Sequence, residues 1–333
     1  MKNTLVAALC LAIATACPVP AAAAAPKAPP SPETLRLQVL LDRLAFSPGA
    51  IDGHSGATLT KALKGYQQAN GLTPTGQLDD ATKKAFAAAG DVPGTVEVTL
   101  GTQDFAGPFV GPMPTKPADQ AKLPEMGYAD VMEALAERYH TTPETLRTLN
   151  PPDTKLVAGS KIKVPNVVPA ATAYPDTLKP DWRAELTALN VSSDQPKAAK
   201  LVVSKSQGVL RVLDAAGKLL AQFPATMGSA HDPLPIGKWK VQGTSYLPTY
   251  HFNPALFWDA KPGQTKETLK GGPNSPVGVV WMDLDKPHYG IHGTPNPEKI
   301  GRTESHGCIR LTNWDAARLS LMVKPGTPAE FVR

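Results

Sequence analysis

Proline divides this chain into separate units. The 333 residues include 35 prolines, roughly twice the share that is usual in globular proteins. They cluster with alanine in residues 26–32, and with alanine and aspartate in residues 167–198. Because proline cannot continue a helix or a central strand, these stretches predict linkers and argue against a bundle of long helices. The sequence therefore predicts a multidomain α+β protein with units at 31–90, 127–166 and 199–332.

The first 25 residues have the pattern of an export signal. Lys2 supplies a positive charge, residues 5–16 form an apolar run too short to cross a bilayer, and the alanines at 21–25 offer cleavage sites. A buried N-terminal helix is one alternative. Lipid attachment at Cys17 is another, although Ala14 stands where such a signal usually has leucine. No later stretch approaches 18 apolar residues, so no transmembrane segment is expected.

Residues 31–90 have the apolar spacing of three short helices. Leu37, Leu40, Leu41 and Leu44 lie on one helical face, and a second such run and a third short helix near 79–88 follow. The turn residues between them resemble, in their order, the peptidoglycan-binding-like domain found beside many wall enzymes: Gly49, Ile51-Asp52-Gly53, Gly56, Asn70-Gly71-Leu72 and Gly76. An unrelated three-helix domain is the alternative.

Residues 91–126 are rich in Gly, Pro and Thr and are expected to form an extended linker or a hairpin. Residues 127–166 then predict two short helices followed by a strand at 157–164. This segment resembles a degenerate LysM repeat. Because the usual opening strand and the Gly-Asp-Thr-Leu signature are missing, glycan binding and a purely structural spacer both remain open.

Residues 199–333 are rich in short β patterns. Apolar and alternating runs separated by Gly and Pro predict strands at 201–203, 209–213, 219–223, 239–241, 277–281, 289–292 and 329–332. One helix is expected near 314–323, capped by Thr312 or Asn313. Many short strands with tight turns predict a β sandwich or barrel-like domain.

The charge balance argues against nucleic-acid binding. The chain carries 34 Lys and Arg against 29 Asp and Glu, a net charge of +5. The excess lies in residues 199–333, which hold 16 basic and 10 acidic residues. A modest basic excess suits an anionic polymer, but no dense Lys/Arg stripe marks a nucleic-acid surface.

Chemistry-bearing residues concentrate in 288–310. They include three histidines and Cys308, which is the only cysteine left once the signal with Cys10 and Cys17 is removed, so no internal disulfide is expected. A zinc site is unfavourable, because His288 and His292 in one strand would lie ~13 Å apart. An inert buried cysteine is a second interpretation. The polar neighbours of the thiol favour a third, a nucleophilic cysteine activated by histidine.

The third interpretation gives each nearby residue a role. His306, two residues from Cys308 on an extended chain, would lie ~7 Å from it, so His292 from another strand is the preferred base. Gly307 lets substrate approach the backbone, where amides could bind an oxyanion. Arg310 could bind a substrate carboxylate or pair with a structural carboxylate such as Asp315.

Two motifs carry a closer resemblance. Ile291-His292-Gly293-Thr294-Pro295 and Ser305-His306-Gly307-Cys308-Ile309-Arg310-Leu311 resemble the signature of the YkuD-type L,D-transpeptidases, over roughly residues 199–332. The resemblance implies that Cys308 is the nucleophile and His292 the general base, oriented by the carbonyl of Gly293. It places His306 as the second histidine and Gly307 in the catalytic loop, with Arg310 and Ser305 on the substrate side.

The resemblance also implies a reaction, acyl transfer on peptidoglycan stem peptides. Cys308 would attack the carbonyl of the third, diaminopimelyl residue, D-alanine would leave, and an amine would resolve the thioester. The acceptor could be another diaminopimelate, giving a 3→3 crosslink, or a lipoprotein lysine or a D-amino acid. No metal or organic cofactor is implied. A hydrolase using the same cysteine, or a non-catalytic wall-binding protein, are the alternatives.

The predicted arrangement fits a periplasmic or cell-wall-associated enzyme. The upstream units would hold it on glycan strands and raise its effective concentration near the substrate. The proline-rich linkers predict loose coupling between these units and the catalytic domain. The alternative is that the N-terminal unit covers the catalytic cleft as a lid.

Overall fold

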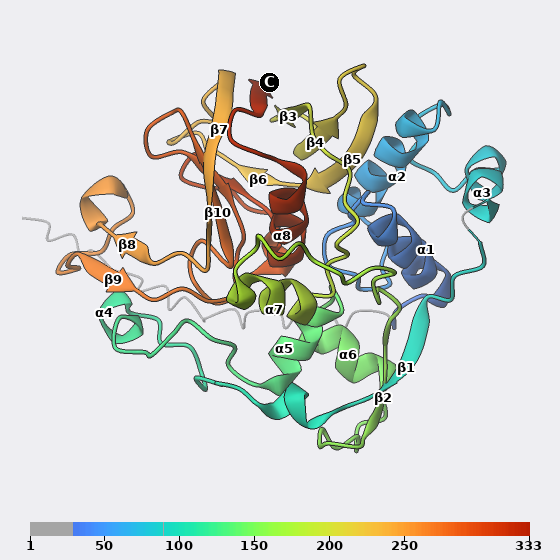
Figure 1. Ribbon diagram of the computed structural model, residues 1–333, viewed down its shortest axis with the longest axis horizontal. Helices are drawn as coiled ribbons and strands as arrows, with labels where there is room; N and C mark the ends of the chain where they lie inside the picture. The colour runs from blue at the N-terminus through green and yellow to red at the C-terminus, as the bar shows by residue number, and fades with distance from the viewer. Residues whose placement is uncertain (1–28, 89) are drawn as a thin grey trace, which may run out of the picture.

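The computed structural model describes residues 29–88 and 90–333 (Figure 1). The predicted export signal, residues 1–25, and the lipid-attachment alternative at Cys17 lie outside the described residues. Within the described ranges, no helix has the length and apolar character needed to cross a membrane.

Three helices form the N-terminal unit, as predicted: α1 (Pro32–Arg43), α2 (Ala57–Ala69) and α3 (Asp80–Ala87). The side chains of Ser31 and Asp79 cap α1 and α3 by accepting backbone N–H groups that the helices leave free. The helices bury a shared apolar cluster in which Tyr66 stacks on Phe86 with 4.3 Å between ring centroids.

The middle unit is larger than predicted. Strand β1 (Thr95–Thr99) pairs antiparallel with β2 (Lys161–Pro165). Helices α5 (Val131–Arg138) and α6 (Pro143–Leu149) lie between these two strands in the chain. Strand β1 lies within residues 91–126, the stretch expected to be an extended linker or a hairpin. Residues 100–130 separate it from α5 and contain the short helices η1 (Thr102–Phe105) and α4 (Pro117–Gln120).

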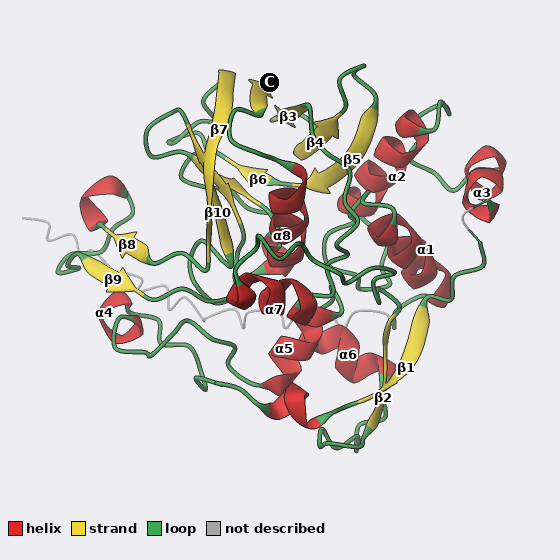
Figure 2. Ribbon diagram, viewed as in Figure 1, coloured by secondary structure: helices red, strands yellow, loops and turns green. Residues whose placement is uncertain are grey.

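The second predicted linker is also structured. Residues 167–198 contain α7 (Pro180–Ala188), whose Trp182 and Leu186 are buried in the core of the catalytic unit. Figure 2 shows α5, α6 and α7 close together beneath the sheet. The prediction that 167–198 is a linker is wrong, because its apolar side chains complete that core.

The C-terminal unit is built on a nine-stranded sheet, and its strands are β3 (Lys200–Ser204), β4 (Val209–Leu213), β5 (Leu219–Pro224), β6 (Thr226–Met227), β7 (Gly237–Tyr246), β10 (Val280–Leu284), β11 (Gly290–His292), β12 (Ile309–Arg310) and β13 (Pro328–Val332). Their order is β5-β4-β3-β13-β7-β10-β11-β12-β6. The two outermost strands, β5 and β6, follow one another directly in sequence, so the sheet curls towards a barrel. This confirms the predicted β-rich, barrel-like domain.

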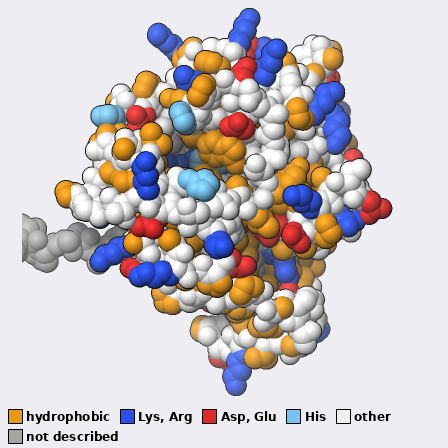
Figure 3. Space-filling view, turned by 60° about the vertical axis from the view of Figure 1, so that its left-hand side comes forward, with side chains coloured by type: hydrophobic (Ala, Val, Ile, Leu, Met, Phe, Trp, Pro, Cys, Tyr) orange, Lys and Arg blue, Asp and Glu red, His pale blue; other side chains and the backbone are white. Residues whose placement is uncertain are grey.

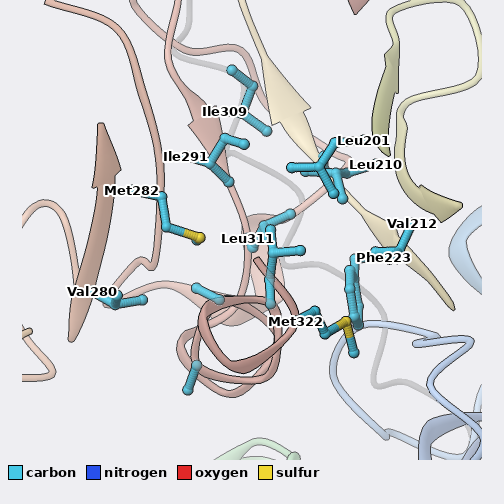
Figure 4. Close-up of a cluster of buried hydrophobic side chains, with 14 of the residues drawn as sticks. Leu201, Leu210, Val212, Phe223, Val280, Met282, Ile291, Ile309, Leu311 and Met322 are labelled. Carbon is cyan, nitrogen blue, oxygen red and sulfur yellow. The ribbon is translucent and has the colours of Figure 1, made fainter. Parts of the chain in front are cut away.

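The core of this unit lies between the curled sheet and helix α8 (Asn313–Met322). Figure 4 shows side chains from both ends of the sheet and from the helix meeting there, among them Phe223, Ile291, Ile309, Leu311 and Met322. Each of these five is at most 1% exposed. The close packing fixes β11 and β12, which carry the chemistry described below.

A separate hairpin stands out from this sheet. Strands β8 (Tyr250–Phe252) and β9 (Glu267–Leu269) pair antiparallel, with the short helix η2 (Pro254–Leu256) between them. Helix α4 of the middle unit lies beside β9 (Figure 1). A further short helix, η3 (Pro297–Lys299), lies between β11 and β12 in sequence.

The three units are joined by a buried polar cluster, consisting of Asp42, Ser47, His140, Asp315 and Arg318. Arg318 donates to Asp42 at 2.7 Å, the Nδ1 of His140 lies 3.0 Å from the same carboxylate, and Ser47 donates to Asp315 at 2.6 Å. All five side chains are at most 5% exposed. The expected loose coupling is therefore wrong, since each unit supplies a member of one buried network.

Candidate active site

Two parallel strands bring the predicted catalytic residues together. In the β11–β12 pair, Ile291 is opposite Ile309 and His292 is opposite Arg310. Both isoleucines point into the core, so the alternation of side chains places His292, Arg310 and Cys308 together on the other face. Strand spacing and rise put the backbones of Cys308 and His292 about 8 Å apart diagonally. The two side chains lie on one face and can approach across that distance, and the pairing of the Cys308 thiol with the His292 imidazole stays a prediction.

The imidazole of His292 is held as a neutral base. Its Nδ1 lies 2.7 Å from the carbonyl oxygen of Gly293, and a carbonyl can only accept, so Nδ1 carries the proton and Nε2 presents a lone pair. The ring stacks on Trp281 with 5.3 Å between centroids. Burial, together with the nearby Arg310 charge, lowers the pKa of His292 to about 3. The orienting carbonyl that the resemblance assigned to Gly293 is thus found in the structure.

Cys308 is half-buried and its thiol is protonated at rest. The Sγ–H donates to the carbonyl of His288 at 3.7 Å. Burial raises the pKa of the thiol, while a backbone hydrogen bond from Gly290 and the Arg310 charge oppose that rise. The thiol and the imidazole are therefore both neutral at rest, and a proton would pass between them only when a reaction draws it.

Arg310 is a partly buried cation whose Nε has no hydrogen-bond partner within the described residues. Burial lowers the pKa of its guanidinium, and the groups that favour its charge are Cys308, Tyr250 and Asp259. The alternative pairing with Asp315 is wrong: Asp315 is fully buried, accepts from Ser47 and lies 3.8 Å from Arg318. Arg310 is thus left facing the site, where it can bind an anion.

Ser305 and Gly307 shape the catalytic loop. Ser305 is 4% exposed; its Oγ accepts from Gly228 N and donates to the Cys308 carbonyl, each at 2.7 Å. Both hydrogen bonds of Ser305 hold the loop, and its contact with substrate stays a prediction. Gly307 has φ +100°, and an added Cβ would lie 2.7 Å from the Tyr289 ring. The glycine is needed for backbone conformation and close packing, in addition to any substrate approach.

His306 connects the loop to the hairpin. Its Nε2 lies 3.0 Å from Asp259 Oδ1, and the edge of its ring meets Phe257 with centroids 5.0 Å apart. Trp258, between them in sequence, stacks on His231. In Figure 3, histidine side chains gather around a hollow on the face turned forward, the side that carries β8 and β9. Sequence reasoning missed these hairpin residues, because no motif or apolar periodicity marks them.

The N-terminal unit lies away from this hairpin. Its contacts with the catalytic unit include β5, where Gln222 donates to the Lys61 carbonyl at 2.7 Å, α8 through Asp42 and Arg318, and the segment between β11 and β12, where Thr58 lies beside Gly301. Hairpin residues of the catalytic unit itself border the hollow instead. The lid alternative for residues 31–90 thus receives no support from the contacts.

The comparisons with known proteins agree with this geometry. Residues 198–330 match the YkuD family, described as the L,D-transpeptidase catalytic domain. Residues 30–86 match the family described as "Putative peptidoglycan binding domain". The chain therefore carries a catalytic domain of the L,D-transpeptidase family, with a peptidoglycan-binding domain ahead of it.

Individual relatives cover parts of the chain. The "Putative L,D-transpeptidase YkuD" of Bacillus licheniformis is 51% identical over 55 residues, which are 16% of this chain and 33% of that protein. The "Putative L,D-transpeptidase YqjB" of Bacillus subtilis is 29% identical over 134 residues, 38% of this chain and 67% of that protein. The match to the first of these spans only about a third of its length.

Solved structures with some likeness include an L,D-transpeptidase from Xylanimonas cellulosilytica, with 13% identity and a TM-score of 0.36 over 94% of this chain and all of that one. An L,D-transpeptidase from Mycobacterium smegmatis has 22% identity and a TM-score of 0.33, over 39% of this chain and 57% of that one.

Proposed function

We propose that this chain is an L,D-transpeptidase that transfers an acyl group from peptidoglycan stem peptides through a thioester on Cys308. One observation carries the proposal: the Gly293 carbonyl fixes the Nδ1–H tautomer of His292, so that Nε2 can accept a proton on the face that carries Cys308. The family match over residues 198–330 supports the same chemistry.

The proposed first half-reaction forms the thioester. The Sγ of Cys308 attacks the carbonyl of the third residue of a tetrapeptide stem, and the thiol proton passes to Nε2 of His292. Backbone N–H groups at Gly307 and Cys308 stabilise the oxyanion. The C–N bond to D-alanine then breaks, and His292 returns the proton to the departing amine. In the second half-reaction an acceptor amine attacks the thioester and gives a proton to His292. The Cys308 thiolate then leaves and takes that proton back from His292.

Arg310 links substrate binding to base strength. Its positive charge is one of the causes that lower the pKa of His292. A substrate carboxylate, such as that of the terminal D-alanine, would pair with Arg310 and offset this repulsion. The imidazole then accepts the thiol proton more readily when a substrate is bound than when the site is empty. This protects the thiol from unproductive reactions.

The remaining parts of the proposal concern location and acceptor. The predicted signal in residues 1–25 supports export to the periplasm or cell wall. The peptidoglycan-binding domain, and the middle unit if it binds glycan as a LysM repeat does, would hold the enzyme on its polymeric substrate. The acceptor amine would come from a second diaminopimelate, a lipoprotein lysine or a free D-amino acid.

The test is incubation of the full exported chain with a defined disaccharide-tetrapeptide, with the products weighed by mass spectrometry. A dimer that has lost one D-alanine supports transpeptidation. A tripeptide that has gained water instead indicates a hydrolase. The matched control is Cys308→Ala, which should form neither product. Unchanged substrate with the folded wild-type chain, or products from the alanine variant, would contradict the proposal.

A further inference from the structure

A glutamate from outside the catalytic domain reaches the back of the candidate active site. Glu137 lies on α5 of the middle unit and is 5% exposed. Both of its carboxyl oxygens accept from Asn313 Nδ2, at 3.1 and 2.9 Å. Tyr128, also of the middle unit, donates to Oε2 at 3.3 Å. Asn313 is the first residue of α8 and is fully buried.

Asn313 in turn holds the backbone that orients His292. Its Oδ1 accepts from Val279 N at 3.2 Å, and its Nδ2 also donates to the carbonyl of Pro273 at 3.1 Å. The same Oδ1 lies so close to Gly293 that an added Cβ there would be 2.2 Å away. A Cβ added to Gly278, which has φ +62°, would lie 2.0 Å from the same Oδ1 and 2.6 Å from the carbonyl carbon of Gly293. The peptide whose carbonyl binds His292 is therefore clamped.

We infer that Glu137 is a positioning residue for His292, acting through Asn313 and Gly293. The inference rests on the proposed function, because His292 has a base to be positioned only if Cys308 is a nucleophile. The steps are all contacts: the Glu137 carboxyl orients the Asn313 amide, the amide oxygen packs against Gly293, and the Gly293 carbonyl holds Nδ1–H of His292. If the amide turns, the carbonyl shifts and the imidazole loses its fixed tautomer.

The surroundings of Glu137 indicate which substitutions at this position test its role. Burial raises the pKa of Glu137 to about 8, helped by the nearby carboxylates Glu133 and Glu185 and opposed by the Asn313 and Tyr128 hydrogen bonds. At neutral pH the side chain is an uncharged acid whose oxygens accept from Asn313 and Tyr128. Glutamine has the same shape and is also uncharged, and its amide oxygen can accept from Asn313 in the same place. Methionine fills a similar volume and can accept no hydrogen bond of comparable strength.

The test measures the thiol itself in the purified full chain. Alkylation of Cys308 by iodoacetamide is followed across pH 5 to 9, alongside thermal unfolding. Glu137→Met should slow alkylation at pH 7 about tenfold. It should also shift the apparent pKa of the Cys308 thiol upward, because the imidazole of His292 is no longer held in position. Glu137→Gln should restore the wild-type profile. Asn313→Ala should match Glu137→Met, and the double variant should lose no more than either alone.

Arg138→Ala is the matched control on the same helix. Arg138 donates to Asp104 and to the carbonyl of Ala188 on α7, and none of its hydrogen bonds among the described residues involves Asn313, so this variant loosens α5 and leaves the Glu137–Asn313 contact in place. It should lower the melting temperature and leave the alkylation profile unchanged. The inference is overturned if Glu137→Met alkylates as wild type does, or if Arg138→Ala slows alkylation equally. Iodoacetamide needs no peptidoglycan, so failure here is distinct from failure to convert muropeptides.

Discussion

At the scale of single residues, the site is prepared by hydrogen bonds that leave specific atoms free. The Gly293 carbonyl occupies Nδ1 of His292 and leaves Nε2 open. Ser305 uses its hydroxyl to hold the loop and leaves the thiol of Cys308 at the surface of the hollow. Arg310 keeps an unpartnered Nε. Each atom that the proposed reaction requires is available because a neighbour has fixed the other atoms of the same group.

The two histidines should differ sharply in their contribution. His292→Ala should reduce the rate of Cys308 acylation by a carbapenem about 10²–10⁴-fold, because the proton acceptor is lost. His306→Ala should cost less than about tenfold, because His306 pairs with partly exposed Asp259. Stopped-flow measurement of acylation compares them directly. A larger loss for His306 would reverse the assignment.

A second prediction at this scale concerns pH. The folded state holds a proton on Glu137 up to a pKa of about 8, whereas the unfolded chain releases it near 4.5. Stability contributed by this group is therefore lost as pH rises from about 4.5 to 8. Glu185 and Asp315, with pKa values raised by burial to about 7 and about 6, act in the same direction. His292, whose pKa is lowered, acts oppositely below pH 6.5.

Glu137→Gln removes one of these titrations and should flatten the fall in melting temperature between pH 5 and 8. Glu97→Gln is the control, because Glu97 is exposed on β1 and pairs only with the surface residue Lys161. Melting temperatures of the three proteins, measured at one-unit pH steps, give the answer. Parallel curves for wild type and Glu137→Gln would show that Glu137 does not hold a proton in the folded state.

At the scale of elements, the sequence predicted what local patterns specify. Alternating apolar residues marked β3, β4 and β5, and Thr312 was one of the expected caps of α8, where its side chain accepts from Asp315 N. Strand β1 was missed because its partner β2 lies more than sixty residues later, so no local pattern registers the pairing. Three of the prolines taken as linker signals instead begin helices: Pro32, Pro117 and Pro180. Proline is tolerated in a first helical turn, where the N–H is unused.

The residues of the candidate site also divide into those that a local sequence pattern predicts and those that it does not. Cys308, His292 and Arg310 were predictable because they lie within a short motif on two adjacent strands. Asp259 and Glu137 were not, because each reaches the site from a segment far away in sequence, and Trp281 was not, because its place opposite His292 depends on the register of β10 and β11. Only the folded sheet and the packing of α5 on α8 bring them there.

The β8–β9 hairpin should shield the acyl-enzyme from water. Phe257 and Asp259 both contact His306, beside the thiol. Asp259→Ala should therefore speed hydrolysis of the carbapenem thioester about two- to threefold, a small effect because the pair is partly exposed. Mass spectrometry of the adduct over time measures the loss. Asp176→Ala, which removes an exposed carboxylate paired with Arg183 outside the hairpin, is the control. Equal adduct lifetimes would argue against shielding.

At the scale of the whole molecule, three sequence units behave as one structure. Asp42 is fully buried, and although burial opposes its ionisation, Arg318 and His140 hold its pKa well below the usual range. His140 also binds the Leu189 carbonyl at 2.7 Å and stacks on Trp314. Removing any one unit would leave buried charges of the others without partners.

Deletion of residues 31–90 should therefore destabilise the catalytic domain and reduce its activity even on soluble peptides. Asp42→Asn isolates the cause and should cost about 3–5 kcal/mol in the free energy of unfolding, because Arg318 stays buried without its countercharge. Asp52→Asn, in the same unit but away from α8, should cost much less. Urea unfolding of the full-length variants measures both. A truncated chain with unchanged stability would show that the units fold independently.

The position of β13 in the sheet has a consequence for how the protein is made. It is the last strand in chain order, yet it lies between β3 and β7 and pairs with both. While a ribosome or an export channel still holds residues 328–332, the early strands and the later ones have no shared neighbour to join them. Arg318 is also synthesised late, so the buried carboxylate of Asp42 gains its partner only at this stage. The sheet thus cannot close around β11 and β12, which carry the candidate site, until residues 328–332 are free to pair.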